Sequence, residues 1–375
     1  MVSIAGCAGW PFAPPPPLDH RAWQHGLDLV RVGSRHLLVW SSAGNPPQPV
    51  PGEEWQHDVY ASWIDPYAPR LDIRTLVAAP QGQDPSSTAV NASGRILVTY
   101  EDGERGPNQR AGLWDASLKP VNVHPILVRR GGHSGHAAAL GDTFLVTYGE
   151  GWVKGGGDSD RGTGDDIWAR VVEHDGTLGP EIAIAVDPRR AYRDWWPVVS
   201  ASDRNWLVVW QRYSTAALWG ALIDAKGRVT KKFVITDDVV TDRYGVYGVR
   251  YLPSLQRYLV TGTKPGGGFA ALLDTDGTVL VLRTGLPRPA PQSHVIAQSN
   301  AKAVRAVYPV VPSGVAVLDV GARSLRLDKV LEHAYRWDYM GTDGVFVTPD
   351  KVLFATLSRE GVQLFHVTGI AGSGR

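Results

Sequence analysis

The sequence has little of three features that define large classes of protein. Its 375 residues include one cysteine, so no disulfide can form within the chain and a thiolate metal cluster is not expected. No apolar run approaches the roughly 20 residues that span a bilayer. The net charge is +1, and basic and acidic residues are mixed along the chain. Because nucleic-acid binding depends on concentrated positive charge, we expect neither a nucleic-acid nor a membrane partner.

The start of the chain shows no targeting signal. The stretch MVSIAGCAGWPFAPPPP lacks a basic beginning, and prolines interrupt its apolar residues. We therefore expect no signal peptide and a cytoplasmic location. Cys7 ends a short Ile-Ala-Gly-Cys segment that resembles a bacterial lipobox, which argues weakly against a cytoplasmic location. The stretch before Cys7 is too short to be a leader.

Several catalytic motifs are also missing. There is no Gly-x-Ser-x-Gly, no phosphate-binding P-loop and no dinucleotide fingerprint. The sialidase Asp-box, Ser-x-Asp-x-Gly-x-Thr-Trp, is absent as well. We therefore expect no organic cofactor, with Ca²⁺ or another divalent metal as the alternative.

What the chain does have is a repeat of short strands. Residues 196–235 contain four short runs rich in Val, Ile and Trp, separated by Asp, Asn, Ser and Gly, which is typical of antiparallel strands. The second run recurs about every 50 residues. Its copies are HLLVW at 36–40, RILVTY at 95–100, TFLVTY at 143–148, NWLVVW at 205–210, RYLVT at 257–261, RAVY at 305–308 and KVLFA at 351–355.

Seven units of four strands resemble a seven-bladed β-propeller of a bacterial type, without a WD40 or kelch signature. The resemblance implies an all-β protein in which residues 1–375 form a single domain. A fourth strand is visible in six units and not in the last. We expect residues 2–5, within an N-terminal extension of residues 1–24, to complete the last blade, because an open edge strand is costly. Rings of six or eight blades are the alternatives.

The loops differ strongly between the two faces of such a ring. Turns between first and second, and third and fourth, strands are short, and several contain Asp-Gly, a strong hairpin signal. The other connections are long and carry charged and aromatic residues. Because loops on a rigid scaffold carry function, we expect one composite site on the loop-rich face.

Two of the long connections share an Ala-Tyr-Arg motif followed by Asp and aromatic residues. Arginine binds carboxylates in a planar, bidentate way, and aromatic rings supply stacking walls. We therefore expect substrate contacts from Arg193, Arg336, Trp195, Trp196, Trp337, Trp55 and Trp152, with Tyr192 and Tyr335 as catalytic candidates. The alternative is that these polar networks brace adjacent blades.

Histidines add candidates for acid/base or metal chemistry. His25 and His133 occupy equivalent positions on innermost strands, and His136 and His294 lie nearby in their own blades. We take His133, His136, His294 and His333 as candidate catalytic residues. A metal, if present, would be bound either by His25 and His133 or by Asp158, Asp160 and Asp165 in a loop rich in glycine and aspartate. The alternatives are isolated histidines that bond the backbone, and a solvated loop.

Three functions remain open. The first is a lyase, cyclase or isomerase that uses acid/base chemistry on a carboxylate-bearing sugar or secondary metabolite, because a base plus a cationic clamp suits proton removal beside a carboxylate. The second is a lectin-like carbohydrate-binding propeller, and the third is a protein-interaction scaffold. Whether the protein is an enzyme or a lectin, we expect its ligand to be a small molecule or a saccharide. We expect the protein to be a monomer.

Overall fold

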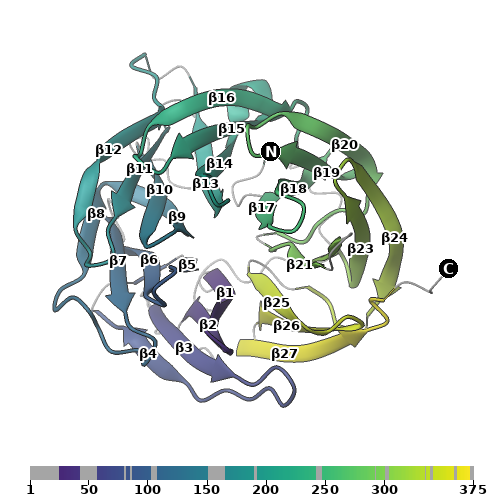
Figure 1. Cartoon of the computed structure of the whole chain (residues 1–375), viewed down its shortest axis with the longest axis horizontal. Coiled ribbons are helices and arrows are strands. Elements are labelled where there is room, and N and C mark those ends of the chain that lie inside the picture. The colour runs from purple at the N-terminus through teal and green to yellow at the C-terminus, as the bar shows by residue number, and fades with distance from the viewer. Residues whose placement is uncertain are drawn as a thin grey trace, which may run out of the picture.

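Seven antiparallel sheets stand side by side around a central channel (Figure 1). The structure is a computed structural model. It describes residues 25–42, 57–79, 82–84, 87–102, 108–150, 165–189, 192–241, 247–291, 293–299, 304–333, 335–337, 341–358 and 361–371. The seven sheets confirm the seven-bladed β-propeller expected from the repeat.

Each sheet is a meander whose first strand faces the channel. The innermost strands are β1 (His25–Val32), β5 (Ser87–Val90), β9 (Gly132–Leu140), β13 (Asp194–Ala201), β17 (Tyr247–Leu252), β21 (Ile296–Ser299) and β25 (Thr342–Thr348). The second strands, which carry the repeated motif, are β2 (Arg35–Ser42), β6 (Ile96–Asp102), β10 (Thr143–Glu150), β14 (Asn205–Arg212), β18 (Arg257–Lys264), β22 (Val304–Pro309) and β26 (Lys351–Ser358).

The third and fourth strands form the outer part of each blade. The third strands are β3 (Asp58–Ile64), β7 (Asn108–Trp114), β11 (Asp166–Val172), β15 (Ala217–Asp224), β19 (Gly267–Asp274), β23 (Gly314–Gly321) and β27 (Gly361–Thr368). The outer strands of the first six blades are β4 (Arg74–Val77), β8 (Ile126–Arg130), β12 (Leu178–Ala185), β16 (Val229–Thr236), β20 (Val279–Leu286) and β24 (Ser324–Glu332).

The last blade has three strands within the described residues, β25, β26 and β27. The expected closing strand, residues 2–5, lies outside the described residues, as does the rest of the extension up to residue 24. The ring itself closes because β1 of the first blade contacts β25 of the last. We call this junction of the first and last blades the seam.

Hydrophobic cores lie between the blades, one at each of the seven junctions. At the seam, for example, Leu29 of β1 and Trp40 of β2 pack with Leu353 of β26. A blade is therefore apolar on both faces, which explains why the second strands read as continuous apolar runs and not as an alternating pattern. Burial between sheets supplies the main driving force that closes the ring.

Glycine-containing hairpin turns, two of them Asp-Gly, join third and fourth strands as the sequence indicates. Gly176, Gly227 and Gly277 each have a positive φ, between 77° and 90°. In each turn the glycine N–H donates to the carbonyl oxygen three residues earlier. Glycine reaches this left-handed conformation at no steric cost. These turns lie on the face opposite the long loops, because consecutive turns of a meander alternate between faces.

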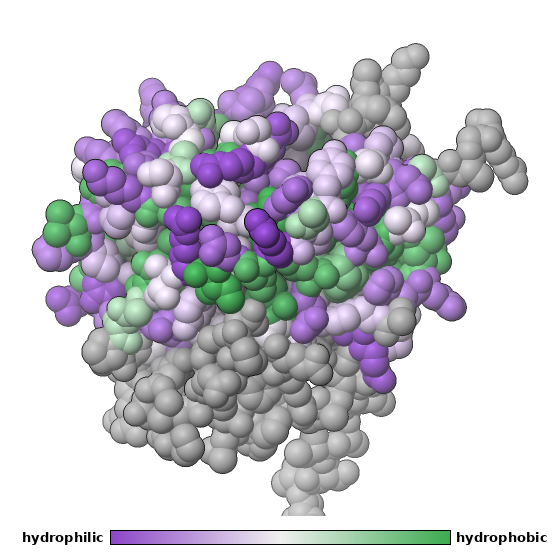
Figure 2. Space-filling model, turned by 90° about the horizontal axis from the view of Figure 1, so that it is seen from below, coloured by the Kyte–Doolittle hydropathy of each residue, from purple (hydrophilic) through white to green (hydrophobic). Residues whose placement is uncertain are grey.

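Helical structure within the described residues is one 3₁₀ turn at Tyr213–Thr215. Among those residues no helix is long and apolar enough to cross a membrane. The rim near β3, β4 and β27 is covered mainly by hydrophilic side chains, with a narrow band of apolar ones between them (Figure 2).

Candidate functional site

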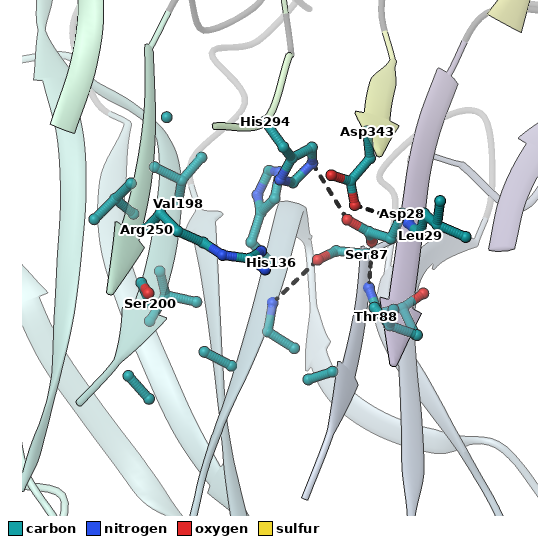
Figure 3. A pocket seen from close by; sticks show the side chains of 18 of the residues that line it. Asp28, Leu29, Ser87, Thr88, His136, Val198, Ser200, Arg250, His294 and Asp343 are labelled. Atoms are coloured by element: carbon teal, nitrogen blue, oxygen red, sulfur yellow. Dashed lines mark hydrogen bonds and ion pairs between the residues drawn. The ribbon is translucent and has the colours of Figure 1, made fainter. Parts of the chain in front are cut away.

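The innermost strands enclose a cavity of about 410 Å³ whose wall carries an unusual set of charged and imidazole side chains. Figure 3 shows these side chains converging on the cavity from different blades. We call Asp28, His136, Arg250, His294 and Asp343 the channel set. They come from five different blades, so only closure of the ring brings them together.

Equivalent positions on consecutive inner strands supply part of this set. The pairing register places Asp28 opposite Val39 of β2, and the same register position is occupied by Ser87 in β5, His136 in β9 and Asp343 in β25. The repeat thus holds one residue per blade at one depth in the channel.

Three of these side chains accept a hydrogen bond from the backbone of the next blade. The Leu29 N–H donates to Asp343 Oδ2 at 2.8 Å, and the Thr88 N–H donates to Asp28 Oδ2 at 2.5 Å. The Ala137 N–H donates to Ser87 Oγ at 3.4 Å. These bonds tie neighbouring inner strands together and fix the direction of both carboxylates.

His294 reaches the two carboxylates from blade six, which adjoins the blade of Asp343. It lies just before β21, where Ser293 forms a parallel bridge with Thr342 and the His294 N–H donates to the Thr342 carbonyl oxygen at 3.0 Å. This anchor places His294 Nε2 3.2 Å from Asp28 Oδ1. Ligand atoms of His294, Asp28 and Asp343 all lie within 4.8 Å of one another.

The environment of Asp28 disfavours its charge. Burial raises the pKa of its carboxyl from 3.8 to about 6, and the nearby Asp343 acts in the same direction. The His294 imidazole and the Arg250 guanidinium oppose this effect on the pKa. Carboxyl groups with a perturbed pKa of this kind cluster at functional sites.

His136 has a defined hydrogen-bonding state. Its Nδ1 lies 3.1 Å from the carbonyl oxygen of Ser134, and because a carbonyl can only accept, Nδ1 carries the proton. In the neutral ring Nε2 is therefore the nitrogen that can accept a proton. The ring of Trp196 meets that of His136 edge-on at a centroid distance of 5.7 Å.

Trp196 takes this position through an unusual backbone. Its φ is +55°, in the left-handed region, and a bulge interrupts the pairing of β13 between Trp195 and Val198. The Tyr247 hydroxyl donates to the Trp196 carbonyl oxygen at 2.5 Å and supports the bulge. Non-glycine residues in this region cost free energy and concentrate at functional sites.

Arg250 is one of two arginines that line the cavity, the other being Arg31. Its side chain is exposed to the cavity and, within the described residues, makes no ion pair within 4.0 Å. Figure 3 shows it extending from β17 into the space beside His136. An arginine held in this way presents its guanidinium to an anionic ligand.

Of the residues predicted from the sequence, three line this cavity: His136, His294 and Trp196. Sequence reasoning missed Asp28, Arg250 and Asp343. A signal for two of them was present, because counting back from the second-strand motif assigns Asp28 and Asp343 the same position as His136.

The other residues of the first Ala-Tyr-Arg segment lie between blades three and four. Arg193 is buried and its Nε is 2.5 Å from Asp165 Oδ2, with its guanidinium 4.2 Å above the Trp195 ring. His133 is fully buried against Trp195, at a ring distance of 4.9 Å. We call His133, Asp165 and Arg193 the junction set. These contacts match the bracing alternative.

Burial also defines the chemistry of the junction set. Burial, together with the smaller effect of the positive charge on Arg193, lowers the pKa of His133 from 6.5 to about 3. The imidazole therefore stays neutral. Tyr192 lies at the edge of this region, where its ring packs under Arg212 at 4.5 Å, and Arg212 pairs with Asp194 at 2.8 Å.

The second Ala-Tyr-Arg segment lies at the junction of blades six and seven. Trp337 is fully buried, and its indole N–H donates to the Gly314 carbonyl oxygen at 2.6 Å. Tyr335 and His333 stack on Phe365, with ring centroids 4.6 and 4.9 Å away. Arg336 is exposed. The two segments share a face of the ring, but each contacts its own blade junction and they form no common pocket among the described residues.

Several candidates fall outside the described residues. These are Trp55, Trp152, Asp158 and Asp160, and for His25 the strand is described but the side chain is not. Their roles stay predictions. Asp165, the third aspartate of the predicted metal loop, is described and contacts Arg193.

Comparison with known proteins identifies the fold and no family. No protein-family model matches the chain, and no curated protein matches it in sequence. Among solved structures, the BP39L lectin from Burkholderia pseudomallei superposes with a TM-score of 0.60 at 10% identity, covering 94% of this chain and 97% of the lectin.

Two further structures extend the range of functions on this fold. The polysaccharide lyase Uly1 gives a TM-score of 0.56 at 8% identity over 98% of this chain and 94% of the lyase. A chain of the mitotic checkpoint complex gives 0.53 at 9% identity over 92% of this chain and 87% of that one. At these identities the likeness establishes the fold alone, so function must be argued from the site.

Proposed function

We propose that the protein is an enzyme that binds a small carboxylate-bearing molecule in its central channel and moves a proton on it, as a lyase, cyclase or isomerase does. One observation carries the proposal. The cavity places a cation without an ion-pair partner among the described residues, Arg250, beside an imidazole whose acceptor nitrogen is defined, His136.

The two residues supply the parts that proton removal beside a carboxylate requires. Arg250 binds the ligand carboxylate and stabilises the negative charge that develops on it when the neighbouring C–H bond breaks. His136 Nε2 takes that proton as general base. The electron pair of the C–H bond moves into the enolate. In a lyase it then expels a leaving group from the next carbon, and in an isomerase a proton returns elsewhere.

The substrate class follows from the shape and polarity of the cavity. A volume of about 410 Å³ accommodates a small molecule or one or two sugar residues, and its wall mixes hydroxyl, imidazole and charged groups. A uronic acid, or a secondary metabolite with a carboxylate, combines the anionic and hydroxyl groups that these residues recognise.

The alternative functions have less support. A lectin of this kind needs exposed aromatic platforms, but Trp195, Trp196 and Trp337 are 2%, 5% and 0% exposed. An interaction scaffold needs a broad apolar patch. Large exposed apolar side chains among the described residues are instead dispersed over many blades: Tyr67, Ile73, Val123, Val186, Val234, Leu282 and Val330.

A panel of uronic acids, oligouronates and small hydroxy and keto carboxylates tests the proposal, with binding followed by calorimetry and turnover by product analysis. For a ligand that wild type converts, Arg250→Met should raise KM at least 10-fold, because it removes the carboxylate contact. His136→Gln should lower kcat by about 100-fold or more while binding persists.

Arg257→Met is the matched control, because Arg257 is an arginine on the next strand that does not line the cavity. It should leave both constants unchanged. Failure of every carboxylate in the panel to bind, or equal kinetics for Arg250→Met and wild type, would contradict the proposal. Binding of neutral sugars without turnover, as tight as that of the carboxylates, would favour the lectin-like function instead.

A further inference from the structure

We propose that Asp28, His294 and Asp343 bind a divalent first-row metal ion, of the Mn²⁺ or Zn²⁺ kind, at the seam of the ring. The inference stands apart from the proposed enzymatic function, because the ion would be held whether or not the channel turns over a substrate. It rests on the geometry of three side chains from three blades and on a charge that the fold itself does not need.

The three donors already lie near the spacing of a metal site. Two donors bonded to one tetrahedral ion at about 2.1 Å are about 3.4 Å apart. His294 Nε2 and Asp28 Oδ1 are 3.2 Å apart, and all three ligand atoms fall within 4.8 Å. A shift of about an ångström, within reach of side-chain rotation, completes the coordination.

The carboxylates carry more charge than their structural task requires. Asp28 and Asp343 each accept a backbone N–H from the next blade. Ser87 accepts the corresponding bond in its own blade, and Ser200 accepts one from the Tyr251 N–H at 3.0 Å. A neutral hydroxyl therefore suffices to join two blades. Two buried carboxylates side by side repel each other, and a cation between them removes that cost.

The surroundings resemble those of a metal site rather than of a simple ion pair. Asp343 also accepts the Gly344 N–H through its other oxygen, Oδ1, at 2.8 Å. Backbone donors of this kind orient ligating carboxylates, as outer-shell groups do around bound metals. Each carboxylate oxygen keeps a second lone pair for the ion. Asp28 and Asp343 are 6% and 4% exposed, while the half-buried His294 lies on the cavity side.

The donor set selects the class of metal. One imidazole with two carboxylates suits Mn²⁺, Fe²⁺ or Zn²⁺. Ca²⁺ prefers six to eight oxygen ligands, and Mg²⁺ prefers oxygen and retains water. Three protein ligands leave coordination positions that open into the cavity, where water or a ligand carboxylate can bind. Such an ion also joins blade six, blade seven and blade one across the seam.

Metal binding to the tag-free protein, stripped with EDTA, tests the inference. Calorimetric titration with Mn²⁺ and Zn²⁺ should give one site per chain, with Ca²⁺ and Mg²⁺ at least 10-fold weaker. At a free metal concentration about 100 times Kd, the Tm should rise by about 3 °C. Asp343→Asn keeps the hydrogen-bond acceptor but removes the charge, and should weaken binding at least 10-fold, as should His294→Gln.

Ser87→Ala is the matched control, because it deletes a bracing hydrogen bond of the same kind without touching the metal ligands. It should lower the Tm while leaving the metal-induced rise unchanged. The inference is overturned if wild type neither binds these ions nor shifts in Tm, or if Asp343→Asn and His294→Gln bind as wild type does. Arg250→Met and His136→Gln should bind metal normally, so loss of their turnover would bear on the enzymatic proposal alone.

Discussion

The junction set and the channel set are built from the same residue types and meet opposite environments. His133, Asp165 and Arg193 lie sealed between blades three and four, where the ion pair is 1–2% exposed. Asp28, Arg250 and His294 face a cavity, and His294 is 39% exposed. In the first set the arginine and aspartate neutralise each other. In the second the arginine has no such partner among the described residues.

This difference indicates how one fold separates stability from function. Breaking a buried ion pair leaves an uncompensated charge and is strongly destabilising. At the cavity, by contrast, the fold keeps a carboxyl group in surroundings that disfavour its charged form, as the raised pKa of Asp28 indicates. We therefore expect the junction set to stabilise the ring and the channel set to be available for a ligand. Four predictions test that division.

The largest effect is expected for the two arginines. Arg193→Met leaves Asp165 charged and buried, and should lower the free energy of unfolding by about 3–5 kcal/mol. Arg250→Met breaks no ion pair of the described residues and should change it by less than about 0.5 kcal/mol. Urea denaturation of both variants measures the difference. Equal losses would mean that the two sets do not differ in role.

The second effect concerns acid stability and His133. Because its pKa in the folded protein is about 3, below the unfolded value of 6.5, the unfolded state binds the proton first. Stability from this group is complete above pH 6.5 and is lost as the pH falls toward 3, by about 3 kcal/mol at pH 4.

Unfolding measured between pH 7 and pH 4 should therefore show a shallower decline for His133→Gln than for wild type. His174, an exposed histidine in a turn, offers the control His174→Gln, which should follow wild type. Identical slopes for His133→Gln and wild type would refute the assignment of His133 to a neutral, structural role.

The third prediction is that substitutions at two aspartates change the free energy of unfolding in opposite directions. In EDTA at pH 7.5, Asp28→Asn should raise the free energy of unfolding by about 1–2 kcal/mol, because the folded protein disfavours the charge and the amide oxygen can still accept from Thr88. Asp165→Asn should lower it, because Arg193 loses its counter-ion. Two changes of the same sign would remove the distinction.

The smallest effect probes packing around the junction set. A Cβ added at Gly149 would lie 2.5 Å from the His133 ring, so Gly149→Ala should cost about 1–2 kcal/mol through overpacking. At Gly179 in β12 the nearest atoms would be 3.5 Å away, and Gly179→Ala should be nearly neutral. Thermal unfolding compares the two, and a neutral Gly149→Ala would show that His133 can move aside.

The repeat made the fold predictable, but it allowed only part of the candidate site to be predicted. The second-strand motif placed all seven blades, because a strand buried on both faces must be apolar throughout. Counting back from the same motif also predicted that His136 and His294 lie near the channel. The Ala-Tyr-Arg segments pointed to one shared pocket, yet Arg193 and Trp337 pack into different blade junctions. A local motif indicates what kind of group a side chain can bind. It does not indicate which neighbouring residue that side chain contacts in the folded protein.

Periodicity, apolar runs and Asp-Gly turns thus determined the number of blades and the order of strands, since these depend on neighbouring residues in the chain. The channel set was decided only by closure of the ring. Asp28 and Asp343 are separated by most of the sequence and meet at the seam, and the bulge that turns Trp196 toward His136 depends on Tyr247 of the next blade. Contacts between blades, set by burial across sheets, convert equivalent positions into one site.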